Sequence, residues 1–131
     1  MTRRNISEEE ARGALEKGAR NVSDEDVTKV VKKAEEIEGK FRTKGPLKRF
    51  IDDVKLMISL VKDYANGNYR SIPYWTIAAV VAALIYVINP VDLIPDFIPV
   101  IGFVDDAAVV SVCLLLVEQD LVKYREWKAK Q

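Results

Sequence analysis

The sequence has no histidine and a single cysteine, Cys113, among its 131 residues. Histidine is the commonest general base, so its absence excludes the usual serine and cysteine catalytic triads. One cysteine cannot form a disulfide within the chain, which fits a reducing compartment. Cys113 lies between Val112 and Leu114, and we expect a small core residue rather than a nucleophile. The chain also lacks a glycine-rich phosphate loop, so the commonest enzyme classes are not indicated.

Lysine and arginine are absent from residues 71–122, although the chain contains 20 of them. Six of the 20 acidic residues fall in that stretch, which therefore carries −6, while the remainder carries +6 and the whole chain is neutral. Nucleic-acid binding needs a sustained basic surface, and we expect no nucleic-acid partner. Apolar residues make up 49% of the chain, which is enough to expect a folded domain rather than disorder.

Two helices are expected before residue 45. Ser7 with Glu10, and Ser23 with Asp26, have the spacing of capping boxes at helix starts, and the first helix should end near Asn21. The second helix carries one apolar stripe at helical spacing, formed by Val27, Val30, Val31, Ala34, Ile37 and Phe41. We expect this stripe to pack into a core. The alternative is an adaptor that uses the stripe to bind a helix of a partner protein.

A third helix is expected between the break at Gly45-Pro46 and the stop signal at Asn66-Gly67. Its apolar stripe consists of Leu47, Phe50, Ile51, Val54, Ile58 and Val61. The opposite side is basic, with Lys44, Lys48, Arg49, Lys55 and Lys62, and this charge is diluted by Asp52, Asp53 and Asp63. Such a helix can lie on an anionic membrane surface, or its basic side can be an ordinary solvated face.

The segment Ile72–Ile88 has 17 residues and no charge. A helix that is apolar on every side is either a central core helix or a membrane span. Its length as a helix, about 26 Å, is near the lower limit for the ~30 Å hydrocarbon layer of a bilayer. Tyr74, Trp75 and Tyr86 lie near its two ends, where aromatic residues mark a membrane interface.

A second apolar segment, residues 102–117, contains Asp105 and Asp106. Basic residues flank the two apolar segments, and by the positive-inside rule both chain ends would be cytoplasmic. An aspartate at the centre of a span costs about 2.5–3.5 kcal/mol, so a simple lipid-facing second span is not expected. Three arrangements remain: acids that face a protein or water cavity, partial membrane entry, or a soluble bundle in which amphipathic helices wrap the hairpin.

Four aspartates surround the connection between the apolar segments: Asp92, Asp96, Asp105 and Asp106. Carboxylates grouped in this way could bind a hard cation such as Mg²⁺ or Ca²⁺. The alternatives are helix capping, hydrogen bonding inside the fold, and proton chemistry. For a buried carboxylate at Asp105 or Asp106 the candidate partners are Arg70, Tyr74, Tyr86, Asn89 and backbone amides of the proline-rich turn.

The run from Asn89 to Asp106, Asn-Pro-Val-Asp-Leu-Ile-Pro-Asp-Phe-Ile-Pro-Val-Ile-Gly-Phe-Val-Asp-Asp, resembles the signature of the YkvA-like bacterial family, a domain of unknown function. The resemblance covers residues 73–122. It implies a helical hairpin that is often predicted to associate with membranes, and it implies no reaction.

Together these patterns predict an all-α protein of five or six helices. Residues 1–45 would form an amphipathic helical extension, and residues 46–131 a YkvA-like hairpin domain with a proline-rich acidic turn. The expected function is a noncatalytic module at the cytoplasmic membrane that associates with itself or with a protein partner. The alternative is a soluble cytoplasmic bundle whose aspartates bind a divalent cation, with hydrolysis as one use of that cation.

Overall fold

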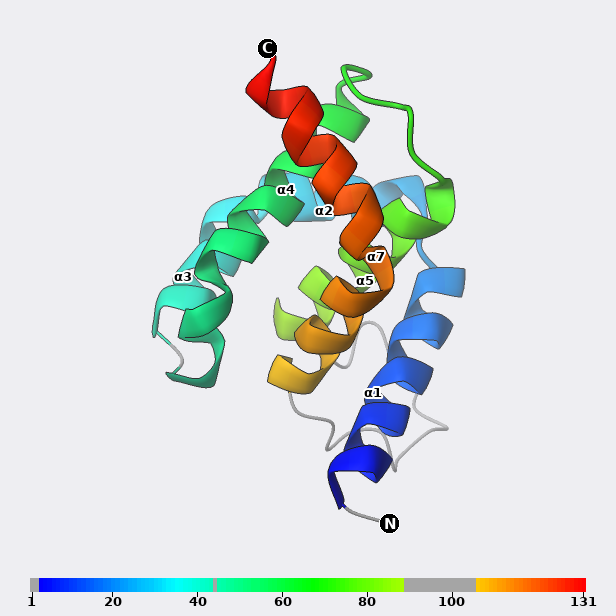
Figure 1. The fold of residues 1–131 in the computed structure, drawn as a ribbon, viewed down its shortest axis with the longest axis vertical. Helices are drawn as coiled ribbons and strands as arrows, with labels where there is room; N and C mark the ends of the chain where they lie inside the picture. The colour runs from blue at the N-terminus through cyan, green and yellow to red at the C-terminus, as the bar shows by residue number, and fades with distance from the viewer. Residues whose placement is uncertain (1–2, 44, 89–105) are drawn as a thin grey trace.

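The elements of the computed structural model are all helical in the parts that it describes, residues 3–43, 45–88 and 106–131 (Figure 1). Six α-helices and one 3₁₀ helix lie there, which confirms the predicted all-α class. They are α1 (Arg3–Arg20), α2 (Asp24–Lys32), α3 (Ala34–Thr43), η1 (Gly45–Phe50), α4 (Ile51–Ala65), α5 (Tyr74–Ile88) and α7 (Asp106–Ala129).

Helix α1 begins before the predicted capping box. Ser7 lies inside the helix, which starts at Arg3, so the prediction of a helix start at Ser7 is wrong. A capping serine must adopt an extended conformation, and the helical backbone continues through this position instead. The end of the helix is close to the expected one, because the side chain of Asn21 donates to the Lys17 carbonyl at 3.1 Å.

Helix α2 begins as predicted, but the stripe that starts on it is shared by two helices. The backbone N–H of Ser23 donates to Asp26 at 3.0 Å, as a capping box requires. The α-helix is interrupted at Lys33, whose backbone N–H still bonds to Lys29. Backbone hydrogen bonds of the i,i+4 type continue across the interruption, so the spacing of the apolar residues along the sequence is unchanged. That spacing alone therefore could not reveal the interruption.

The stripe on α2 and α3 is part of the core of this chain. Val27, Val30 and Ile37 are all buried, and Phe41 is fully buried. These residues belong to one hydrophobic cluster that also contains residues of α1, α4, α5 and α7. A helix of a partner protein could not reach them without opening the fold, so the packing interpretation of the stripe is confirmed.

Helix α4 follows a short 3₁₀ segment instead of starting directly after the Gly45-Pro46 break. Leu47 and Phe50 on η1 are buried with the α4 residues Val54, Ile58 and Val61, so the predicted stripe spans both elements. The helix ends at Ala65 with Asn66 as its C-cap, and Gly67 has a φ of 82°. This left-handed conformation is the helix-ending conformation expected of the Asn66-Gly67 pair.

Helix α5 is the central element of the fold. All its residues from Thr76 to Val87 are buried, and it contacts α1, α2, α3, α4 and α7 (Figure 1). A helix that is apolar on every side has no polar face to expose to water. In this fold the other helices surround it. Tyr86, expected at an interface, is 1% exposed, whereas Tyr74 and Trp75 are 44% and 45% exposed.

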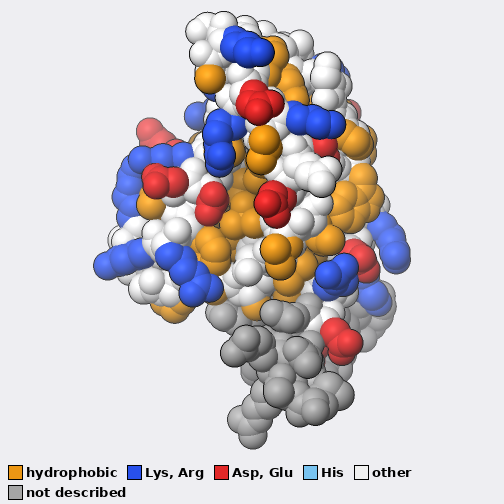
Figure 2. Space-filling model, in the orientation of Figure 1, with side chains coloured by type: hydrophobic (Ala, Val, Ile, Leu, Met, Phe, Trp, Pro, Cys, Tyr) orange, Lys and Arg blue, Asp and Glu red, His pale blue; other side chains and the backbone are white. Residues whose placement is uncertain are grey.

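Helix α7 continues well beyond the predicted end of the second apolar segment at residue 117. Leu121 and Tyr124 are buried further along it, because the apolar spacing extends into the basic tail. Near its middle, Asp120 accepts a hydrogen bond from the Thr76 hydroxyl of α5 at 2.6 Å. The side of the molecule on which α7 lies in front also carries hydrophobic side chains at the surface (Figure 2).

A search of the described ranges finds no helix that combines the length and the apolarity needed to cross a bilayer.

The central position of α5 can be tested with one substitution at two sites. Leu84→Ala should lower the free energy of unfolding by about 2–5 kcal/mol, because Leu84 is fully buried and the shortened side chain leaves a cavity. Leu115→Ala is the matched control, since Leu115 is 68% exposed and its truncation should cost less than about 0.5 kcal/mol. Urea unfolding followed by circular dichroism measures both. Equal losses would contradict the central burial of α5.

Candidate functional site

The predicted cation site lies mostly outside the described residues. This applies to Asp92, Asp96 and Asp105, so the site stays a prediction from the sequence. Asp106 is the first residue of α7 and is half-buried. A carboxylate in the first turn of a helix is favoured by the helix dipole, in keeping with a capping role for this residue. Among the described ranges no group of three or more potential metal-ligating side chains is present.

Lys40 of α3 is bound to the end of α5 at which the predicted acidic turn begins. Its ammonium group donates to the carbonyls of Val87 at 3.2 Å and of Ile88 at 3.0 Å. The last carbonyls of a helix lack partners within the helix, and α5 has no basic residue in its own last turn. Lys40 therefore supplies from another element both the donor and the positive charge that this helix end needs.

Two of the partners proposed for Asp105 and Asp106 have other roles. The Arg70 Nε donates to the Tyr64 carbonyl at 2.7 Å, and the Tyr74 hydroxyl donates to the Val22 carbonyl at 3.2 Å. Tyr74 is the first residue of α5 and Arg70 lies in the loop before it, so Tyr74 is about 20 Å from the end of the helix by the helix rise. We infer that neither side chain is placed to meet a carboxylate near the start of α7.

A buried polar cluster that the sequence analysis missed lies between α4 and the C-terminal part of α7. The Asp63 carboxylate is 7% exposed and accepts hydrogen bonds from the Tyr124 hydroxyl at 2.5 Å and from Lys128 Nζ at 3.0 Å. The Tyr124 oxygen is also hydrogen bonded to Ser59 at 2.5 Å. Tyr69 packs against Tyr124, with ring centroids 5.1 Å apart. This cluster binds the end of α7 to α4 and to the loop that follows α4.

The electrostatics of this cluster favour an ionised Asp63. Burial by itself would raise the pKa of the Asp63 carboxyl, but hydrogen bonds from Tyr124, Lys128 and Asn68 outweigh burial and hold the pKa below its usual value. Burial raises the pKa of the Tyr124 hydroxyl, and its bond to Asp63 raises that pKa further. The tyrosine thus remains a donor and the carboxylate an acceptor, which suits a structural bond rather than proton transfer near neutral pH.

The sequence contained a signal for this cluster that we interpreted differently. The sequence predicts Asp63 to be one of the acids that dilute a basic helix face, but Asp63 is buried, so that prediction is wrong. Val117, Leu121, Tyr124 and Lys128 follow each other at helical spacing, which extends the buried side of α7 through the tail. Only the packing of α4 against α7 shows that the carboxylate lies opposite this row.

Cys113 is buried, and its thiol lies 3.6 Å from the Ala79 carbonyl of α5. Burial raises the pKa of the thiol to about 12. A thiol that does not ionise near neutral pH is a poor nucleophile, so Cys113 is a core residue, as expected.

An aromatic edge, which we define as Tyr64, Tyr74, Trp75 and Arg70, lies where α4 ends and α5 begins. The rings of Tyr64 and Tyr74 have centroids 6.4 Å apart, and the Arg70 guanidinium lies 4.4 Å from the centroid of Tyr64. Burial, and then Asp24, raise the pKa of Tyr74. Because Tyr74 and Trp75 are nearly half exposed, the edge combines large accessible rings with a cation.

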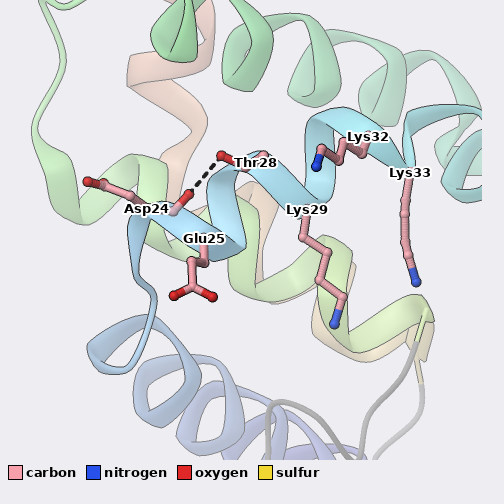
Figure 3. A pocket seen from close by; sticks show the side chains of 6 residues that line it. All are labelled: Asp24, Glu25, Thr28, Lys29, Lys32 and Lys33. Carbon is pink, nitrogen blue, oxygen red and sulfur yellow. Dashed lines mark hydrogen bonds between the residues drawn. The ribbon is translucent and has the colours of Figure 1, made fainter.

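A shallow hollow on α2 has a volume of about 460 Å³ and is lined by charged groups (Figure 3). Asp24 and Glu25 lie toward the start of the helix and Lys29, Lys32 and Lys33 toward its end. This order is the one that a helix dipole favours. The Thr28 hydroxyl donates to the Asp24 carbonyl at 3.1 Å and so is bonded to the backbone of its own helix, as on an ordinary solvated helix surface.

Comparisons with known proteins identify the family of the chain. A family model described as "Protein of unknown function (DUF1232)" matches residues 76–112. The uncharacterized membrane protein YkvA of Bacillus subtilis (strain 168) is 33% identical over 81 residues, which are 62% of this chain and 76% of that protein. The chain belongs to the YkvA-like family. No solved structure gives a significant match.

The region matched by the YkvA-like family model begins on α5 and ends on α7. It therefore contains most of the central helix and the start of its packing partner, whereas Lys40, Asp63 and Tyr124 lie outside it. In this member of the YkvA-like family, contacts from outside the matched region fix one end of each helix.

The first prediction for this region concerns the Asp63 cluster. Asp63→Asn should lower the free energy of unfolding at pH 7 by about 1–3 kcal/mol, because it removes a charged acceptor from a buried network. Since the folded-state pKa is lowered, this stabilisation is present above about pH 4 and is lost as the pH falls further through the folded-state pKa. The difference between wild type and Asp63→Asn should therefore shrink on acidification.

Urea unfolding between pH 7 and the most acidic pH at which the wild type still folds measures this effect. Asp52→Asn is the control, because Asp52 is exposed on the same helix and should change the stability at pH 7 by less than about 0.5 kcal/mol. A difference for Asp63→Asn that grows on acidification would contradict the assigned network.

The second prediction concerns the end of α5. Lys40→Met should lower the free energy of unfolding by about 1–3 kcal/mol, because two carbonyls lose a charged donor. Lys32→Met, at an exposed position on α2, is the matched control and should have little effect. Equal stability of the two variants in urea titrations would show that Lys40 does not act as a cap.

Proposed function

We propose that this protein is a noncatalytic helical module that lies on the face of a membrane and contacts lipid through the aromatic edge. The observation that carries the proposal is the exposure of Tyr74 and Trp75, at 44% and 45%, directly before a stretch of α5 that is wholly buried. Tyrosine and tryptophan prefer the membrane interface because one part of each ring system is apolar and another part is polar.

The basic groups near the aromatic edge also favour this edge as the lipid-binding surface. Arg70 stacks on Tyr64 next to Tyr74, and each basic group near an anionic membrane adds about 1 kcal/mol to the attraction. Lys62 is exposed in the last turn of α4, two residues before Tyr64. Asp24 and Asp26 act on Tyr74 as well, so we assign the main contribution to the rings and a smaller one to charge.

The relative from Bacillus subtilis is named a membrane protein, which supports a membrane location for this chain. A peripheral position agrees with the central burial of α5, because the most apolar helix is already covered by protein. We propose the cytoplasmic face of the membrane, with both chain ends on that side, as the distribution of basic residues predicts. The module would act there by associating with itself or with a partner protein.

The proposal can be tested through Trp75, since the chain has only two tryptophans. In a Trp127→Phe background Trp75 is the one tryptophan fluorophore. Its emission should shift to the blue when vesicles with a quarter of anionic lipid are added, and brominated acyl chains should quench it. The physical reason is transfer of the exposed part of the ring from water to the lipid interface.

Co-sedimentation with the same vesicles measures the binding affinity of variants and supplies a control. Trp75→Ala should weaken co-sedimentation with vesicles about tenfold, from the lost burial of half an aromatic side chain. Val31→Ala, at a half-buried apolar position on α2, is the control and should leave binding unchanged. Unchanged Trp75 emission with both neutral and anionic vesicles would refute the proposed function.

A further inference from the structure

Helix α7 has an exposed apolar face that neither the fold nor the proposed lipid contact uses. Leu115 is 68% exposed and Val122 is 41% exposed. With Leu114 and Leu121 they border a shallow groove of about 330 Å³, which Asp53 of α4 closes on one side.

The charges on this face are arranged with opposite signs along one helix. Glu118 and Arg125 both line the groove, and they are seven residues apart, so they lie on the same side of α7 two turns from one another. That separation, about 10 Å along the axis, is too large for a direct pair within the helix. In the described residues neither side chain forms an ion pair with another group.

We propose that the groove binds α7 of a second copy of this chain, with the two helices antiparallel about a twofold axis near Val122. In a twofold interface the same surface patch of each copy contacts that patch on the other copy. If residue i of the first copy contacts residue j of the second, then residue j of the first also contacts residue i of the second. With the axis between Leu121 and Val122, Glu118 of each copy faces Arg125 of the other, and the two Val122 side chains meet at the centre. Glu118 and Arg125, which are too far apart to pair within one copy, thus form two intermolecular ion pairs around an apolar centre.

The same charges argue against lipid as the occupant. The groove contains two carboxylates, Asp53 and Glu118, and one cation, Arg125, so an anionic membrane surface would be repelled by it. A second copy satisfies both signs at once. This inference rests on the self-association part of the proposed function, and it is distinguished from the lipid contact, which uses a different set of residues at the end of α4 and the start of α5.

Charge reversal tests the pairing, because a twofold interface makes a specific prediction for the double variant. Glu118→Arg should place like charges opposite each other at both symmetric contacts and weaken dimerisation at least about tenfold. Arg125→Glu should do the same. The combined variant Glu118→Arg with Arg125→Glu restores opposite charges across the axis and should dimerise like the wild type. Lys32→Glu, an exposed charge reversal on α2, is the control and should have no effect.

Sedimentation equilibrium of the full chain without lipid measures these constants, and circular dichroism with urea unfolding checks that each variant folds. A monomeric wild type at about 200 μM, or a double variant as weak as the single ones, would overturn the inference. So would increased vesicle binding by Glu118→Arg with no change in oligomeric state, which would make the groove a lipid site. Trp75→Ala should still dimerise, so failure of lipid binding and failure of dimerisation are told apart.

Discussion

The fold depends on the burial of one helix that has no polar side. Residues Thr76 to Val87 of α5 leave no face for water, and every other α-helix in the described ranges contacts this one. Isolated helices of this length are marginal in water, and most of their stability comes from packing an apolar face. The amphipathic helices and α5 therefore stabilise one another, and each apolar stripe is explained by the element that it covers.

Polar contacts between helices then stabilise the helix ends. Lys40 caps the end of α5 from a helix 47 residues away in sequence, and Thr76 near its start donates to Asp120 of α7. The buried Asp63 holds Tyr124 and Lys128 at the other end of α7. Such contacts add little to the total burial, but each satisfies a group that would be costly to bury alone, so they define the relative positions of the helices.

The surfaces available for function are those that remain once α5 is covered. In the functions that we propose, the aromatic edge, with its rings beside a cation, contacts lipid, and the groove on α7, with its self-complementary pair of charges, binds a second copy. The two surfaces use different residues, so a membrane-bound dimer could employ both.

Composition and periodicity alone determined the all-α class, the apolar stripes, the central or membrane-spanning character of residues 72–88, the left-handed stop at Gly67 and the core role of Cys113. These depend on local chemistry and on spacing along one helix, which the sequence contains directly. The tertiary structure decided that α5 is covered by protein, that the helix breaks at Lys33, that Asp63 is buried, and that Lys40 acts as a cap. Each of these depends on which residues distant in sequence lie opposite one another, and helical spacing contains no information on that.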